Sequence, residues 1–160
     1  MFFRKRVTVA DYCAPKLSAL VSDDSARSWT KFKNESSDPA LKAASIKEFA
    51  DELLAAHIQL LSLAITKTFR SIDISMAAYS QINSFLEANS KAYLSELKDK
   101  YNQAFGSSAA DGVLQMARLL NMNLTGGKLD PRTVEAIRDL MYRALAAYFV
   151  DFKSVKLVKP

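Results

Sequence analysis

The sequence predicts an all-α fold, a single-domain bundle of five to seven helices. A chain of 160 residues and 17.8 kDa is long enough for one well-buried core and short for two. Its four glycines and four prolines are few for a protein rich in turns and strands. Neither residue occurs between Pro39 and Gly106, which indicates consecutive helices separated by polar breaks.

Two short helices are expected before Asp38. The first covers "APKLSALVS", with Pro15 in its first turn, where a missing N–H is tolerated. The second covers "DSARSWTKF", and the spacing of Ala26, Trp29 and Phe32 directs these three side chains toward the core.

A long helix is expected from Pro39 to about residue 70, with Asp38 as its N-cap. Apolar residues recur along it at helical spacing and form an unusually broad stripe, including the run "LLAAHIQLLSLAI". That run is too short to span a bilayer and contains polar residues, so it predicts a buried helix. We expect this helix near the centre of the bundle.

The next helical segment starts near Asp73 and continues to about Phe105. Asn89 or Ser90 could cap a new helix, but both residues are also tolerated on the exposed side of a continuous one. The sequence therefore does not decide whether this segment is one helix or two.

The stretch "LNMNLTGGKLDPRT" contains a glycine pair and a lysine, which are also elements of a phosphate-binding loop. Such a loop follows a strand and places Ser or Thr after the lysine, whereas Lys128 is followed by Leu129. The glycines instead suit a helix C-terminus, and Asp130 with Pro131 suits the start of the next helix. The stretch predicts a connection between helices.

A last long helix is expected from Pro131 to about Asp151. No segment shows convincing strand alternation, although the tail "KSVKLVKP" alternates lysine with apolar residues. One domain, residues 1–160, is therefore expected, with flexible basic ends at about 1–7 and 153–160.

The net charge of +5 lies at the two ends of the chain. Residues 1–16 carry a net charge of +3 and residues 151–160 a net charge of +2, so the body between them is neutral. Such ends are candidates for weak, salt-sensitive binding to an anionic membrane or to nucleic acid. The candidate cations are Arg4, Lys5, Arg6, Lys153, Lys156 and Lys159.

Recognisable catalytic patterns are missing from the sequence. His57 is the single histidine and Cys13 the single cysteine, so a zinc site or a histidine-containing di-iron site has too few ligands at suitable spacing. A core position suits His57 best, and general-base catalysis is the alternative. Glu52 and Asp51 are expected to be surface charges. The sequence predicts no metal and no cofactor.

Aromatic side chains could still line a small-molecule pocket between helices. The candidates for such a pocket are His57, Tyr79, Tyr93 and Tyr101, although aromatic residues at helical spacing more often belong to the core.

Without a reactive constellation, the sequence favours a non-catalytic function. The first hypothesis is a cytoplasmic helical bundle that acts through protein–protein contact, with a partner or as a homodimer. A small-molecule binder or enzyme with a pocket near His57 is the alternative, and binding of a membrane or nucleic acid through the basic ends is the second. The cytoplasmic location is expected from the lone cysteine and from an N-terminus that lacks the apolar run of a signal peptide.

Overall fold

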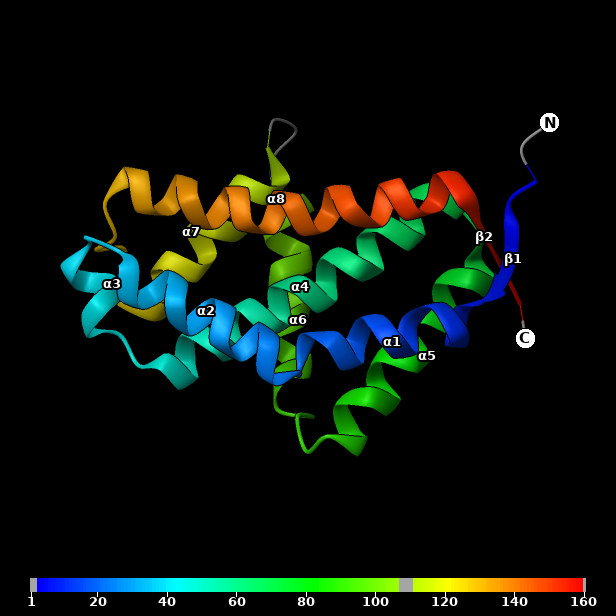
Figure 1. Ribbon diagram of the computed structural model, residues 1–160, viewed down its shortest axis with the longest axis horizontal. Coiled ribbons are helices and arrows are strands. Elements are labelled where there is room, and N and C mark those ends of the chain that lie inside the picture. Colours follow the sequence, from blue (N-terminus) through cyan, green and yellow to red (C-terminus); the bar gives the residue numbers. More distant parts are fainter. Residues whose placement is uncertain (1–2, 107–110, 160) are drawn as a thin grey trace.

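The protein forms an all-α bundle in which both ends of the chain meet in a small sheet (Figure 1). The computed structural model describes residues 3–106 and 111–159. Within these ranges there are eight helices and two strands, so the predicted count of five to seven helices was too low. In chain order they are β1 (Lys5–Thr8), α1 (Val9–Leu20), α2 (Asp23–Glu35), α3 (Pro39–Ala43), α4 (Ile46–Phe69), α5 (Ile72–Ala88), α6 (Leu94–Gly106), α7 (Gly112–Thr125), α8 (Pro131–Ser154) and β2 (Val155–Val158).

The extra helix comes from a break in the segment expected to run from Pro39 to residue 70. Asp38 and Pro39 begin a helix as predicted, but this helix, α3, ends after five residues. Ala44 is extended, and the Ser45 side chain then accepts a hydrogen bond from the backbone N–H of Glu48 to cap α4. A serine can cap a helix or continue it, and here it caps.

Helix α4 lies at the centre of the bundle, as predicted. Every side chain from Glu52 to Leu61 is buried, because α5, α6, α7 and α8 all pack against this helix. By length and composition α4 could cross a membrane, with a mean hydropathy of 1.3 over 18 residues, but 78% of that window is buried inside the fold. Its apolar character is that of a core helix.

The segment after Asp73 contains two helices. Helix α5 ends at Ala88, and Ser90 follows with a positive φ of 56°. The backbone N–H of Lys91 donates to the carbonyl of Leu86 at 2.7 Å, which closes the end of α5. This left-handed turn redirects the chain so that α6 packs against α4.

The glycine pair connects two helices, as predicted. Gly126 ends α7 in a left-handed conformation, with a φ of 68°, and Gly127 follows with a φ of 86°. Asp130 then caps α8 by accepting a hydrogen bond from the backbone N–H of Thr133 at 2.8 Å, and Pro131 takes the first helical position.

The first helix differs from the expectation. Helix α1 begins at Val9 with Thr8 as its N-cap, so Pro15 lies inside the helix and not in its first turn. The preceding strand accounts for the difference, because its last residue, Thr8, provides the capping oxygen for the N–H of Asp11 at 3.1 Å.

The expectation of no strands was also wrong. Strands β1 and β2 pair in parallel, with Lys5 opposite Val155 and Val7 opposite Leu157. Val7 packs against the core and Leu157 is buried within it. Each strand has only four residues and gains its partner from the other end of the chain, so local alternation gave a weak signal.

Candidate functional site

His57 lies in the core, where its ring is enclosed. The Nδ1 atom is 2.7 Å from the backbone carbonyl of Leu53, so Nδ1 carries the hydrogen and donates it. The ring also contacts Trp29, with centroids 5.5 Å apart. Burial lowers the pKa of His57, although the hydrogen bond to Leu53 acts in the opposite direction. The prediction of a core histidine is confirmed.

Tyr101 takes part in a buried polar cluster that joins α4, α6 and α7. Its hydroxyl donates a hydrogen bond to Glu52 Oε2, and Asn123 Nδ2 donates to the same oxygen at 3.3 Å. Burial raises the pKa of Glu52, although both hydrogen bonds act to lower it. Glu52 was expected at the surface. That expectation was wrong because two distant helices supply polar partners for it in the core.

Tyr93 and Tyr79 lie on the surface and point to different partners. The Tyr93 hydroxyl donates to Asp51 Oδ1 at 3.0 Å. The ring of Tyr79 lies under the ammonium of Lys98, which is 4.7 Å from the ring centroid. The structure therefore does not bring the four candidate pocket residues together around one opening.

Among the described residues, five surface hollows have volumes of about 140 to 560 Å³, and His57 lines none of these five. The largest of these five, about 560 Å³, lies where α4 ends and α5 begins. Its wall includes Thr66, Arg70, Ser71 and Ser75, and only Arg70 among its lining residues is charged.

One wall of this hollow is a row of exposed apolar side chains on α5, which we call the α5 ridge: Ile72, Met76 and Tyr79. Their exposed fractions are 78%, 66% and 53%. The spacing of four and three residues places them on one side of the helix. A neighbouring row of α5, which includes Ile74, Ala78 and Ile82, is buried against the bundle. Helix α5 thus carries a second apolar row that its packing against the bundle does not bury.

Sequence reasoning named Tyr79 but missed Ile72 and Met76. The signal was present, because "SIDISMAAYSQI" contains two apolar rows at helical spacing and the body of a protein needs only one. Which row remains exposed depends on the packing of α1 and α4 against α5, and this packing was not visible in the sequence.

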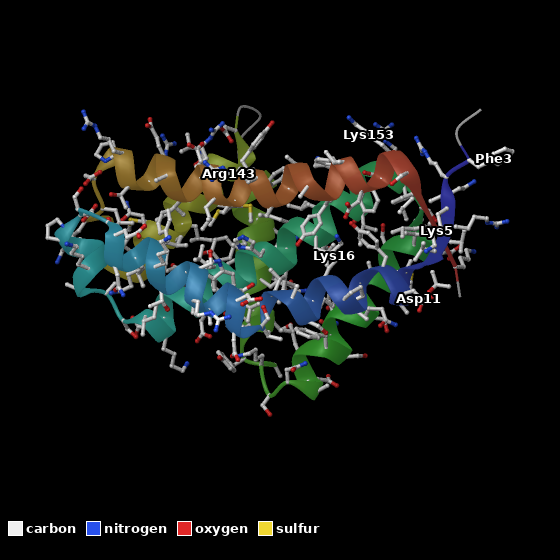
Figure 2. The ribbon with its side chains drawn as sticks, viewed as in Figure 1. Phe3, Lys5, Asp11, Lys16, Arg143 and Lys153 are labelled. Atoms are coloured by element: carbon white, nitrogen blue, oxygen red, sulfur yellow. The ribbon has the colours of Figure 1, made fainter. Side chains whose placement is uncertain are left out.

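The structure brings most of the candidate basic residues to one end of the molecule. Phe3 and Lys5 lie at this end and Lys153 lies on the last part of α8 that leads to it (Figure 2), since Lys5 pairs with Val155 in the sheet. Lys159 forms an ion pair with Asp73. The other five, which we call the terminal cations, have no ion pair or hydrogen bond from their side chains to any residue that the structure describes: Arg4, Lys5, Arg6, Lys153 and Lys156.

Cys13 is fully buried, and burial raises the pKa of its thiol to about 11. A thiol in this environment is protonated at neutral pH and is a poor nucleophile. Over residues 3–106 and 111–159, no group of three or more His, Cys, Asp or Glu side chains is arranged to hold a metal ion.

The chain was compared with known proteins at three levels. No protein-family model matches it, and no match was found among the curated proteins or the solved structures.

Proposed function

We propose that this protein is a non-catalytic helical bundle that acts through protein–protein contact, and that the α5 ridge binds the same surface of a second copy. The observation that carries the proposal is the exposure of Ile72, Met76 and Tyr79 on one side of α5, beside an apolar hollow of about 560 Å³. Large apolar side chains grouped in this way on a protein surface are typical of interaction sites.

The shape of this surface suits a second copy. The ridge stands next to a shallow row of small side chains, because Ser71 and Ser75 are one helical turn apart and line the adjacent hollow. In a pair related by a two-fold axis, the ridge of each copy can enter the hollow of the other. Ridge and hollow on one surface thus provide both halves of a symmetric interface.

The charge distribution is also compatible with self-association. Arg70 is the only charged residue that lines the hollow, and the excess positive charge of the protein belongs to the chain ends. Bringing two α5 surfaces together therefore requires little desolvation of charge.

The first test is the molecular mass in solution, measured by sedimentation equilibrium over a wide range of concentrations. We expect a concentration-dependent dimer, and we expect Met76→Glu to weaken it by at least about tenfold because a carboxylate would be buried without a partner. The matched control is Met122→Glu. Met122 on α7 is 60% exposed, close to the 66% of Met76, so the chemical change is the same on a different surface.

Two results would overturn this proposal. One is a monomer at every concentration, and the other is an equal loss of dimer in Met76→Glu and Met122→Glu. Circular dichroism of both variants checks that the helices remain folded. We expect that they do, because both methionine side chains are largely exposed.

A further inference from the structure

We propose that the terminal cations, together with the outer face of the last turns of α8, form a surface that adsorbs to anionic lipid membranes. The outer face of α8 is defined here by Tyr142, Phe149 and Val150. This surface is made of other residues than the α5 ridge, and the proposal does not depend on self-association.

The cations at this end of the molecule differ in whether they have an ionic partner. Lys16 and Lys159 also belong to the basic ends of the chain, but each has a carboxylate, Asp151 and Asp73 respectively. The terminal cations have none among the residues described in the structure, so their field is directed into solvent.

The register of the sheet places two of these cations next to each other. Arg6 lies directly opposite Lys156, so two like charges stand side by side on the outward-facing side of the strands. Such a pair destabilises a sheet when no counter-charge is present. A surface that carries many negative headgroups offsets this repulsion and brings no requirement for a single precise ligand geometry.

The outer face of α8 carries no carboxylate over its last turns. Asp151 is the only carboxylate from Tyr142 to Lys153 in the sequence. Asp151 contacts α1, where its carboxylate accepts a hydrogen bond from the Tyr12 hydroxyl at 3.0 Å and forms an ion pair with Lys16 at 2.6 Å. The outer face is consequently free of negative charge over these turns.

The same face of α8 is apolar and adjoins Lys153, one of the terminal cations. Tyr142 is 53% exposed, Phe149 37% and Val150 59%, and they line a hollow of about 270 Å³ together with Lys153. Lys153 points outward from the last part of α8, which leads to the end that carries Phe3 and Lys5 (Figure 2), and Phe3 is 90% exposed. Aromatic and aliphatic groups beside lysine and arginine are the composition of a surface that lies in a membrane interface.

The apolar groups favour a lipid surface over nucleic acid. Phosphates attract the same cations in either case, and aromatic rings can stack on bases. An exposed aliphatic side chain such as Val150 has no comparable role in binding a phosphate backbone, but it gains free energy when it enters the acyl region of a bilayer.

The experiment is co-sedimentation of the full chain with vesicles of equal parts phosphatidylcholine and phosphatidylserine, compared with vesicles of phosphatidylcholine alone. We expect binding only to the anionic vesicles, weakened by salt. Each cation near such a surface contributes about fivefold in affinity, so Arg6→Glu/Lys156→Glu should weaken binding by at least about 25-fold. The matched control, Lys31→Glu/Lys128→Glu, makes the same change of net charge toward the opposite end of the molecule and should bind nearly as the parent does.

A second measurement tests insertion. Cys13 is fully buried, so a cysteine introduced at Val150 can be labelled selectively with an environment-sensitive dye. We expect its emission to shift to the blue with anionic vesicles, whereas the same dye on Met122→Cys should not change. Equal binding to both kinds of vesicle, equal losses in both charge variants, or no shift at Val150 would overturn the proposal. Binding of the parent to single-stranded or double-stranded nucleic acid but to neither vesicle would also overturn it and identify a nucleic-acid surface.

Discussion

Single buried residues depart most from what the sequence led us to expect. Glu52 was expected at the surface, and Lys98 was not singled out in the sequence. Both charged residues are buried. Across the described part of the chain, every buried side-chain nitrogen and oxygen has a hydrogen-bond partner. The partners of Glu52 come from positions 49 and 71 residues away in the sequence. No local pattern could have identified them.

His57 gives a prediction at this scale, because burial lowers its pKa in the folded protein. The unfolded chain binds a proton near the ordinary histidine pKa of about 6.5, whereas His57 in the folded chain binds it only at a lower pH, so acidification favours unfolding. The stability that depends on neutral His57 is present above about pH 6.5 and is lost below it. Between about pH 8 and about pH 5.5, we expect the protein to lose up to about 1.4 kcal/mol more stability than His57→Gln does.

The measurement is the free energy of unfolding in urea at several pH values. Glutamine does not titrate and keeps an N–H donor for the carbonyl of Leu53, so it serves as the matched variant. Identical pH profiles for the two proteins would show that His57 is protonated in the folded state as readily as in the unfolded one.

At the scale of elements, the sequence predicted where helices start better than it predicted which helices contact each other. Asp38 and Asp130 were identified as caps from local chemistry, and both cap helices in the structure. The sequence did not show that Asp38 also connects α3 to α8. Its Oδ1 accepts from Ala40 at 2.9 Å, and its Oδ2 accepts from the backbone N–H of Asp130 at 2.8 Å, 92 residues away.

Asp38→Ala should therefore cost more than the loss of an ordinary cap. The substitution removes the acceptor for buried backbone N–H groups at the starts of both α3 and α8. We therefore expect a loss of about 3 kcal/mol in the free energy of unfolding. Ser45→Ala removes an exposed cap from α4 and should cost about 1 kcal/mol. Denaturant unfolding of the two variants compares them directly, and equal losses would mean that the link from Asp38 to α8 adds nothing.

The candidate surfaces were also only partly predictable from elements. The basic residues at both ends were named because charge is visible in sequence, but their assembly into one cluster depends on the pairing of β1 with β2. The hypothesis of a pocket near His57 rested on aromatic spacing. In the folded chain that spacing serves three separate contacts, to Glu52, Asp51 and Lys98.

At the scale of the whole molecule, the all-α class was predictable because long apolar periodicity survives in any packing order. The sheet was not predictable, since its two short strands are stabilised by each other and by the core rather than by local preference. The prediction of one domain can be tested through Leu157, which belongs to the last strand and is 2% exposed.

Leu157→Ala should lower the stability of the entire bundle by about 2 kcal/mol through lost burial. Trp29 is the only tryptophan and lies on α2, away from the sheet, so its fluorescence reports on a distant part of the fold (Figure 1). We expect fluorescence and circular dichroism to shift to the same lower denaturant midpoint, as a single cooperative unit requires. A shift in circular dichroism with an unchanged Trp29 transition would show that the sheet end unfolds separately.

The pairing of β1 with β2 also has a consequence for synthesis on the ribosome. Lys5 and Val155 pair across almost the whole length of the described chain, so the loop that they close contains almost every other element. Helices α1 to α7 can begin to form while the chain is still being made, but β1 waits without a partner until β2 emerges. Arg6 and Lys156 therefore become neighbours only after translation has passed Val158. The cationic end of the molecule then distinguishes a chain that has folded through its last strand from one that has not.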